Sequence, residues 1–308
     1  MILRAVQAVA VLAGISVIVF FVFFVTPGAD PATRLAGRGA SPETISAVRS
    51  QYGLDRALPV QYARMMASLF ITRDLTSFSN RGQAILPMLL DAAPTTLMLA
   101  SGAAVLWLAG GLALALIATA WQSGGHIAIG AGLIGVSIPA FWLGEVVNLL
   151  TQHTYHGSWF LGWVPPLGSG LSLSALILPW TTLALLYAGI YGRVLHAALA
   201  TALQSDPIRT ARAKGLSEAA VLLRHALRLS IGPVIALFGL DFGALVGGGT
   251  VLTEVVFGLH GVGKLTYDAL QTLDLPTLMA VVMYGSVAVV VVNAIADAVA
   301  WSLDPRRH

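Results

Sequence analysis

Six long apolar stretches constrain the fold of this chain more than any other feature of its sequence. Each has about the 20 residues that an α-helix needs to cross the hydrocarbon core of a bilayer. Segments that contain charged residues, proline or glycine separate them. The stretches occupy residues 5–25, 94–120, 127–150, 173–191, 231–252 and 278–303. The sequence therefore predicts an all-α membrane protein with six transmembrane helices.

The composition agrees with a membrane protein and removes several alternatives. Only 10% of the 308 residues are charged and the mean hydropathy is +0.82, whereas a soluble domain carries about 25% charged residues. The chain has no cysteine, which excludes disulfides and thiolate metal sites. The first apolar stretch is too long for the core of a signal peptide, and TPGADP follows it instead of a small-residue cleavage site. We interpret it as a retained membrane anchor.

The positions of Lys and Arg predict the orientation of the helices, because positive charges near span ends mark the cytoplasmic side. They gather in a loop at 193–230 and at the two termini: Arg4, Arg193, Arg209, Arg212, Lys214, Arg224, Arg228, Arg306 and Arg307. We therefore expect this loop and both termini to be cytoplasmic, although the loop WQSGGH adds no Lys or Arg. The expected organisation is a first transmembrane helix at 1–26, an extracytoplasmic helical segment at 27–93 and a five-helix core at 94–308.

The segment between the first two spans is expected to be structured. In SPETISAVRSQYG, Ser41 is a good N-cap, Pro42 suits the first helical position, and Gly53 can close the helix. A second helix is expected to begin at Pro59, with an apolar stripe of Tyr62, Met65, Met66 and Leu69. These helices suit an extracytoplasmic cap that lies on the bilayer surface.

Residues 258–266, GLHGVGKLT, look like a phosphate-binding loop. Gly258, Gly263 and Lys264 reproduce most of the G-x-x-x-x-G-K-[ST] pattern. The predicted topology, however, places this stretch between the fifth and sixth spans, on the side away from cytoplasmic ATP. Leu265 replaces the Ser or Thr that would hold Mg²⁺, and no strand is expected before it. We therefore interpret the stretch as a glycine-rich turn and not as a nucleotide site.

The cytoplasmic loop carries the most informative motif, SDPIRTARAKGLSEAAVLLRHALR at 205–228. Asp206 before Pro207 predicts a helix start and Gly215 a stop, which leaves about two turns. Ser217 is expected to cap a second helix with an apolar face of Leu222, Leu223, Ala226 and Leu227. Because two turns are unstable alone in water, we expect the short basic helix to gain stability by docking on a partner. The alternative is that its basic residues only meet anionic headgroups.

This loop resembles the EAA loop of binding-protein-dependent ABC importer permeases, and RTARAKGLSE with LLRHALR resembles the dipeptide/oligopeptide branch of that family. Arg209, Thr210 and Ala211 occupy the positions of the Glu-Ala-Ala triplet, and Gly215 that of the following glycine. Other stretches are similar to the same branch along almost the whole chain: TPGADP, SPETISAVRSQYGLDRALPVQY, SIPAFWLG, TEVVFGLHGVGKL and LDPRR. Departures are the missing arginines of WQSGGH, an unexpected Glu145, and Asp241 at a position where a neutral polar residue is expected.

The resemblance implies the type I ABC importer permease fold and a non-catalytic subunit that moves dipeptides or oligopeptides across a bacterial inner membrane. It implies a homologous second permease subunit, an extracytoplasmic substrate-binding protein, and two ATP-binding domains, separate or fused, that hold ATP and Mg²⁺. No cofactor is expected on this chain, and no nucleic-acid partner. The ATPase contact is expected on the two-turn helix: Asp206, Pro207, Arg209, Thr210, Ala211, Arg212, Ala213, Lys214 and Gly215.

Other cargoes and two other functional classes stay open at this point. The same architecture can carry haem, nickel complexes or other small solutes. A proton-coupled secondary transporter would use intramembrane carboxylates as relay groups and would show inverted repeats, but no repeat is visible in the sequence. An intramembrane enzyme would need converging catalytic groups, which the sequence does not offer.

Carboxylates inside predicted spans cost about 2.5–3.5 kcal/mol each on insertion scales, so each should face a partner, a cavity or water. They are Glu145, Asp241 and Asp297. Near Asp241, three glycines repeat at spacing four and let helices approach closely: Gly239, Gly243 and Gly247. Either these glycines pack against a partner subunit while Asp241 pairs with a neighbouring donor, or Asp241 lines the passage and meets a peptide's ammonium. The candidate passage residues are Asp241, Gly239, Gly243, Glu145 and Phe141.

An H-x-x-H pair, His153 and His156, falls in an outer loop with Tyr155, Trp159 and Trp163. A zinc or haem site would need a third ligand, and none is apparent. We therefore expect solvated histidines among aromatic residues of the membrane interface.

Overall fold

The computed structural model describes residues 2–24, 32–33, 40–51, 53–80, 83–121, 137–151 and 172–303, together with Gly125, Gly130, Gly132 and Gly135. Within these residues the chain is helical apart from turns and one isolated β-bridge between Thr76 and Ala84. The predicted all-α class is therefore confirmed. In chain order the elements are α1 (Ile2–Phe24), α3 (Pro42–Gln51), α4 (Leu58–Phe70), α5 (Ile85–Ala120), α7 (Ala140–Thr151), α9 (Leu173–Ala202), α10 (Asp206–Ala213), α11 (Glu218–Ala220), the π-helical turn η1 (Val221–Ala226), α12 (Leu227–Ser230), α13 (Gly232–Ala244), the π-helical turn η2 (Leu245–Gly249), α14 (Val251–Val256), α15 (Val262–Thr272) and α16 (Leu275–Leu303).

Among the described residues, four helices are long and apolar enough to cross a membrane, and two shorter apolar helices accompany them. The long ones cover Ile85–Ala120, Leu173–Ala202, Gly232–Gly249 and Leu275–Ser302, and the shorter stretches are Val6–Val22 and Ala140–Thr151. All six fall on predicted spans. The shorter α7 covers only the second half of the third predicted span, because much of 127–150 lies outside the described residues.

The most extensive helix packing joins α5 to α9, and the two helices run in the same direction, since Gly102 contacts Trp180 and Gly111 contacts Tyr191. A Cβ atom on Gly102 would lie 2.0 Å from the Trp180 ring, and one on Gly111 would lie 2.7 Å from Cβ of Tyr191. Glycine is therefore required at both positions for the two backbones to approach so closely. Since the helices are parallel, the chain must return along the bundle between them.

The described glycines of the third predicted span show this return. A Cβ atom on Gly132 would lie 3.1 Å from Cα of Gly189, and one on Gly135 would lie 2.7 Å from the carbonyl oxygen of Leu185. As the residue number rises in this segment, it falls in α9. This antiparallel order is what a third span between α5 and α9 requires.

The first and last helices pack side by side with α4 at one end of the bundle. Phe20 of α1, Met65 of α4, Met279 and Met283 form one buried cluster. The hydroxyls of Ser16 and Tyr62 also share a hydrogen bond of 2.7 Å. The predicted apolar stripe of α4 is confirmed, since Tyr62, Met66 and Leu69 pack against the same cluster.

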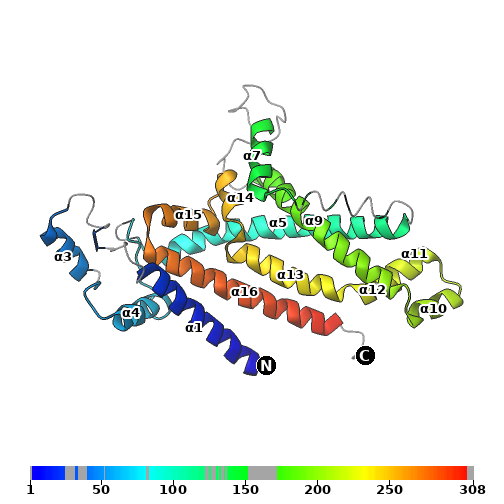
Figure 1. Ribbon diagram of the computed structural model, residues 1–308, viewed down its shortest axis with the longest axis horizontal. Coiled ribbons are helices and arrows are strands. Elements are labelled where there is room, and N and C mark those ends of the chain that lie inside the picture. The colour runs from blue at the N-terminus through cyan, green and yellow to red at the C-terminus, as the bar shows by residue number, and fades with distance from the viewer. Residues whose placement is uncertain are drawn as a thin grey trace.

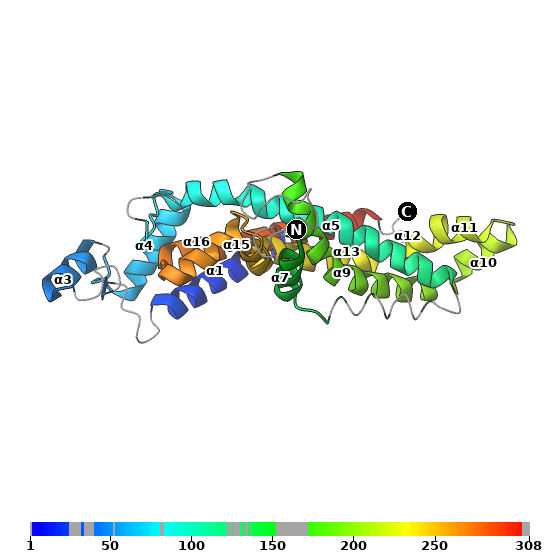
Figure 2. The ribbon, with the colours of Figure 1, turned by 90° about the horizontal axis from the view of Figure 1, so that it is seen from above.

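The helices outside the bundle lie at its two opposite ends (Figures 1 and 2). Figure 1 shows α3 and α4 at one end and α10 and α11 at the other, with α15 on the side of α4. The N-terminal end of α1 and the C-terminal end of α16 both point away from α3 and α4. The segment that follows the first span and the loop that precedes the fifth are thus far apart.

Several boundaries differ from the prediction. The second span begins at Ile85, so Pro94 is inside the helix rather than at its start, which membrane helices tolerate better than soluble ones. The fourth span continues to Ala202, so the first part of the 193–230 loop is helix α9. The fifth ends at Gly249, where the neighbouring Gly248 has a φ of +132° that breaks the helix.

Candidate coupling loop and passage

The two-turn helix of the 193–230 loop forms where the sequence predicts it. Helix α10 starts at Asp206 with Pro207 in its first turn and ends at Ala213. Gly215 then has a φ of +77°, and its N–H donates to the carbonyl oxygen of Arg212 at 2.9 Å. This left-handed stop favours glycine. The Ser217 hydroxyl accepts a hydrogen bond from the N–H of Ala220 at 3.4 Å, which confirms the second cap.

Helix α10 is packed against its own chain, and this corrects the expectation that a partner supplies its stability. Ile208 is fully buried and Ala211 is 5% exposed. Both belong to one cluster with Ala115 of α5, Leu199 of α9 and Val221. Burial of an Ile side chain contributes about 1.5–3 kcal/mol, so the bundle itself stabilises the helix. Ala211 consequently faces the bundle instead of the surface.

The remaining residues predicted to contact an ATPase form an exposed basic face on α10 and the turn after it. They are Asp206, Pro207, Arg209, Thr210, Arg212, Ala213, Lys214 and Gly215. Arg212 donates from Nε and Nη2 to the two carboxylate oxygens of Glu218 at 2.8 and 3.0 Å. These hydrogen bonds raise the pKa of Arg212 and lower the pKa of Glu218. The pair joins α10 to α11 across the Gly215 turn.

The helix after Ser217 differs from its predicted apolar face. Its middle part is the π-helical turn η1, in which one extra residue per turn shifts the side chains that follow. Val221 and Ala226 are fully buried, whereas Leu223 is 52% exposed. Leu223 therefore does not share the face on which Leu222, Ala226 and Leu227 pack, and the predicted apolar face is wrong at this residue, because it assumed the 3.6-residue period throughout.

Asp241 pairs with a donor of its own chain. The Tyr191 hydroxyl of α9 donates to Oδ2 of Asp241 at 2.9 Å, and Asp241 is half-buried on α13. The interpretation in which Asp241 has a structural role required such a neighbouring donor. A carboxylate has about four acceptor positions, so this single bond leaves capacity for a further donor.

The glycine stripe beside Asp241 packs inside the chain. A Cβ atom on Gly239 would lie 2.6 Å from Cβ of Ala296, and one on Gly243 would lie 3.5 Å from Cα of Val289, both on α16. The part of the first interpretation in which these glycines contact a partner subunit is therefore wrong. Residues two positions away on a helix point to nearly opposite sides, so Asp241 faces α9 while the glycines face α16.

Glu145 and Phe141 lie on α7, apart from the other candidate passage residues. Glu145 is exposed and Phe141 is 46% exposed. Helix α7 is tied to α14 by Asn148, whose Nδ2 donates to the carbonyl oxygen of Val256 at 2.9 Å. Among the described residues no hydrogen bond or ion pair joins Glu145 to Asp241. The five candidates therefore lie on three different surfaces. Asp241 faces α9, Gly239 and Gly243 face α16, and Glu145 and Phe141 lie on α7.

An aromatic cluster next to Asp241 is not apparent from the sequence. The ring of Trp107 on α5 is fully buried, and its centroid lies 4.8 Å from that of Tyr187, 5.9 Å from that of Tyr191 and 6.1 Å from that of Phe238. Its Nε1 has no hydrogen-bond partner in the described structure. The cluster joins α5, α9 and α13 in the centre of the bundle, beside the one carboxylate of α13.

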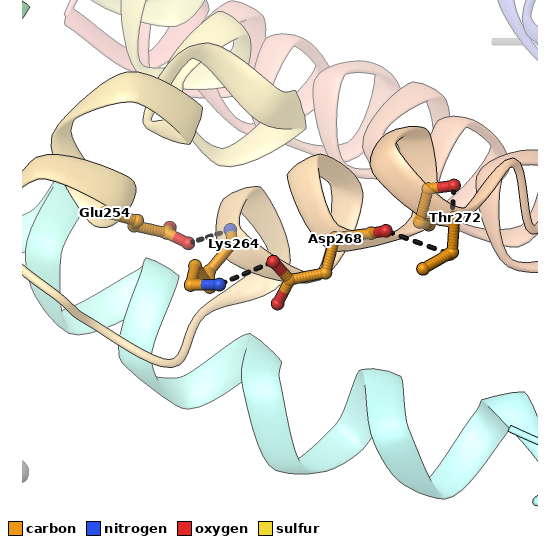
Figure 3. Close-up of polar contacts among 5 residues, drawn as sticks. Glu254, Lys264, Asp268 and Thr272 are labelled. Carbon is orange, nitrogen blue, oxygen red and sulfur yellow. Dashed lines mark hydrogen bonds and ion pairs between the residues drawn. The ribbon is translucent and has the colours of Figure 1, made fainter. Parts of the chain in front are cut away.

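The turn that looks like a phosphate-binding loop does bind an anion, and this anion is the chain's own Glu254. Oε2 of Glu254 accepts the backbone N–H of Lys264 in the first turn of α15 at 2.8 Å (Figure 3). Oε1 accepts the hydroxyls of Thr96 at 2.7 Å and Thr250 at 2.8 Å. Backbone N–H groups at a helix start favour negative charge. Because the carboxylate of Glu254 occupies this position, the structure agrees with the expectation that the turn is not a nucleotide site.

The glycines of that turn make room for the carboxylate. A Cβ atom on Gly261 would lie 2.4 Å from Oε2 of Glu254 and 2.6 Å from the Thr96 hydroxyl, and one on Gly263 would lie 2.9 Å from Oε2. Glu254 itself is fully buried. Burial raises the pKa of its carboxyl, and its hydrogen bonds offset this only in part.

A second buried carboxylate holds the segment before α5 on the bundle. Asp274, 2% exposed, precedes α16 and accepts hydrogen bonds from the Ser77 hydroxyl, the N–H of Phe78 at 3.0 Å and the Ser79 hydroxyl at 2.9 Å. Burial raises the pKa of Asp274, but these bonds and those from Thr277 outweigh it and leave the pKa below its usual value. The sixth helix therefore starts earlier than predicted, directly after this cap.

The predicted histidine pair cannot be placed, since His153 and His156 lie outside the described residues. Across the described part of the chain, no group of three or more His, Asp or Glu side chains is arranged to hold a metal ion. Three polar sites are therefore candidates for a functional role: the basic face of α10, the Asp241–Tyr191 pair, and the buried Glu254 with its hydrogen-bond donors, which we call the Glu254 clamp.

Comparison with known proteins identifies the family. Residues 130–308 match the family described as binding-protein-dependent transport system inner membrane component, and residues 1–100 match its N-terminal region. The chain belongs to this family. It therefore has the type I ABC permease fold, and it is an inner membrane component of a transport system that works with a binding protein and ATPases.

Relatives in this permease family cover nearly the whole chain. One from Brucella suis, named a peptide transport system permease, is 34% identical over 99% of this chain and 97% of its own length. A D,D-dipeptide transport system permease of Escherichia coli is 36% identical over 97% of this chain and 94% of its own. A glutathione transport system permease of Pectobacterium atrosepticum is 34% identical over 94% and 92%.

Proposed function

We propose that this permease carries short peptides into the cytoplasm, driven by ATP hydrolysis on partner subunits. The observation that carries the proposal is the full-length similarity to permeases of peptide, dipeptide and glutathione systems. Their named cargoes share amide bonds and, at one end, a carboxylate. The chain itself performs no chemistry and binds no cofactor; ATP and Mg²⁺ belong to the ATPase subunits.

The proposed complex contains a homologous second permease subunit, two ATP-binding domains, separate or fused, and an extracytoplasmic binding protein. Both termini and the α10 loop face the cytoplasm, and the 27–93 segment faces the other side. Two observations support this orientation. The termini point away from α3 and α4 (Figure 1), and the basic residues of α10 are exposed at the opposite end of the bundle.

The exposed face of α10 is the proposed contact with an ATPase. Its inner face is packed through Ile208 and Ala211 against α5 and α9. Movement of an ATPase domain would therefore be transmitted to two long helices by direct packing. Such a push favours rigid-body rocking over local bending, because packed interiors deform little.

Co-purification and transport together test the proposal. The permease, its partner permease and the ATPases should purify as one complex, and proteoliposomes that contain it should accumulate a labelled dipeptide when ATP and the binding protein are present. An excess of unlabelled dipeptide should compete, whereas a haem or a nickel complex should not. Competition by nickel or haem, with no effect of the dipeptide, would overturn the peptide assignment while keeping the importer class.

Asp241 is the proposed contact for the ammonium group of a peptide. It is half-buried and accepts one hydrogen bond from the described residues, which leaves its carboxylate able to accept a further donor. Asp241→Asn should reduce uptake of a dipeptide with a free amino terminus about tenfold and affect an N-acetylated dipeptide less. Tyr191→Phe is the matched control, since it removes the internal bond and keeps the carboxylate. Equal loss for both peptides, together with poorer assembly, would assign Asp241 a structural role.

A further inference from the structure

The Glu254 clamp joins three separate parts of the chain. Its carboxylate receives the Thr96 hydroxyl from α5, the Thr250 hydroxyl from the start of α14 and the N–H of Lys264 from α15. The Thr96 hydroxyl in turn accepts the N–H of Val262 at 2.8 Å. The outer hairpin, defined here as α14, the turn and α15, is therefore tied to α5 by hydrogen bonds, next to the apolar cluster in which Val262 packs with Leu89 and Ala92.

The clamp differs chemically from a buried ion pair. Among the described residues every donor to Glu254 is neutral, and Lys264 directs its ammonium to Asp268 instead (Figure 3). A buried carboxylate without a cationic partner is costly, and apolar packing of the same volume often stabilises a protein more. What a charged group provides in return is one defined geometry between the elements that it joins.

Helix α5 connects this clamp to the other end of the molecule. It extends from Ile85 to Ala120, 36 residues, which corresponds to a length of about 54 Å. Thr96 lies in its outer part, and Ala115 in its inner part packs in the same cluster as Ile208 and Ala211 of α10. One continuous helix therefore touches both the outer hairpin and the helix proposed to contact an ATPase.

We propose that Glu254 is a positioning residue for transport: it fixes the outer hairpin to α5, so that a binding protein that presses on α15 moves α5 and, through it, α10. The proposal rests on the function proposed above, in which a binding protein docks on the outer side. The exposed surface of α15 offers Asp268 and Gln271 for such a contact. Glu254 itself touches no cargo.

A distance measurement in the assembled complex tests the clamp directly. Because the chain has no cysteine, Leu90→Cys on α5 and Gln271→Cys on α15, both at exposed positions, add the only two thiols of this subunit for spin labels. With Glu254 present we expect one narrow distance distribution. Glu254→Gln, which keeps the shape and removes the charge, should broaden it. The same variant should lose about tenfold in ATP hydrolysis stimulated by the binding protein, with basal hydrolysis and assembly retained.

Two further variants complete the test. Asp91→Asn makes the same chemical change at an exposed carboxylate of α5, outside the clamp and the proposed contact surface, and should leave the distance and the stimulation unchanged. Thr96→Val removes the hydroxyl that Glu254 and Val262 share, and it should reproduce the Glu254→Gln effect even where Glu254→Gln fails to assemble. The double variant should be no worse than Glu254→Gln alone, because both changes break one unit.

A narrow distribution and full stimulation in Glu254→Gln and in Thr96→Val would overturn the proposal. This result is distinct from failure of the proposed function. If the complex carries no peptide, uptake is absent in the unaltered protein, yet the distance and the stimulated hydrolysis still report on the clamp.

Discussion

Helices α10 and α15 lie at opposite ends of the bundle, both follow a turn, and both are short, but they are held in different ways. Helix α10 packs two apolar side chains, Ile208 and Ala211, against the bundle and keeps its polar contacts on the surface. Helix α15 is held at its first turn by the buried carboxylate of Glu254. Water competes for the polar contacts of the first helix and is excluded from the Glu254 contact of the second.

This difference predicts how each end responds to change. Exposed ion pairs add little to stability, because solvent and salt screen them. A buried charge that loses its donors is far more costly. The α10 end can therefore adjust to a partner surface, whereas the outer hairpin is expected to keep one position relative to α5.

The largest effect is expected at Gly261, where an added methyl group meets the clamp itself. In Gly261→Ala the new Cβ would lie 2.4 Å from Oε2 of Glu254 and 2.6 Å from the Thr96 hydroxyl. Overpacking of this kind costs about 1–3 kcal/mol, so the complex should melt several degrees lower. Gly232→Ala is the control, since nothing lies within 4 Å of a Cβ there. Equal melting of the two variants would show that the clamp is not rigid.

The next effect is expected at Gly215, where space is free but the backbone is constrained. A Cβ would meet nothing within 4 Å, yet the φ of +77° is one that side chains rarely adopt. Gly215→Val should cost about 1–2 kcal/mol locally and reduce uptake and stimulated ATP hydrolysis without lowering the melting temperature of the bundle. Gly215→Asn, which tolerates this conformation better, should be milder. Wild-type uptake in Gly215→Val would remove the case for α10 as the coupling element.

Helix starts and stops were predictable because their chemistry is local. Ser41, Pro207 and Gly215 act through hydrogen bonds and φ values within a few residues of themselves. The long apolar stretches were predictable for a similar reason, since length and hydropathy decide whether a helix can span a bilayer. Resemblance supplied the family, and the comparisons confirmed it.

What the sequence did not predict depends on contacts between distant residues or on a change of helical period. The buried face after Ser217 was misassigned at Leu223 because η1 inserts a π-helical turn. One of two interpretations placed the glycines of α13 against a partner subunit, but Ala296 and Val289 of α16 occupy that side. The spacing of these glycines predicts that another helix approaches closely, but it does not predict which helix that is.

Glu254 shows how a misleading motif can still carry information. The G-x-x-x-x-G-K likeness arises because glycines bring backbone N–H groups to one point, and such a point requires an anion. The pattern does not say which anion. A carboxylate four residues before Gly258 was the available signal, and the structure places this Glu254 at the site.

A smaller effect is expected for the ion pair of the α10 end. Arg212→Ala should leave the melting temperature almost unchanged, because Arg212 and Glu218 are exposed. It should weaken stimulated ATP hydrolysis a few-fold at low salt and less at high salt, since screening already weakens the pair. The exchange Arg212→Glu with Glu218→Arg should restore part of the loss. A salt-independent loss with no recovery would mean that Arg212 acts by contacting the partner and not by joining α10 to α11.

The smallest effect is expected at Lys264, the residue that gives the turn its resemblance to a nucleotide site. The clamp uses the backbone N–H of Lys264, and the side chain turns away to Asp268 and lies 5.9 Å from the centroid of the Tyr267 ring. Lys264→Ala keeps that N–H and removes only a partly exposed ion pair. ATP binding by the assembled complex and the distance between α5 and α15 should both be unchanged, while affinity for the binding protein can fall slightly. Loss of ATP binding in an intact complex would place this turn on the cytoplasmic side and invert the proposed orientation. A wider α5–α15 distance would instead show that the outer hairpin depends on its surface charges, as the α10 end does.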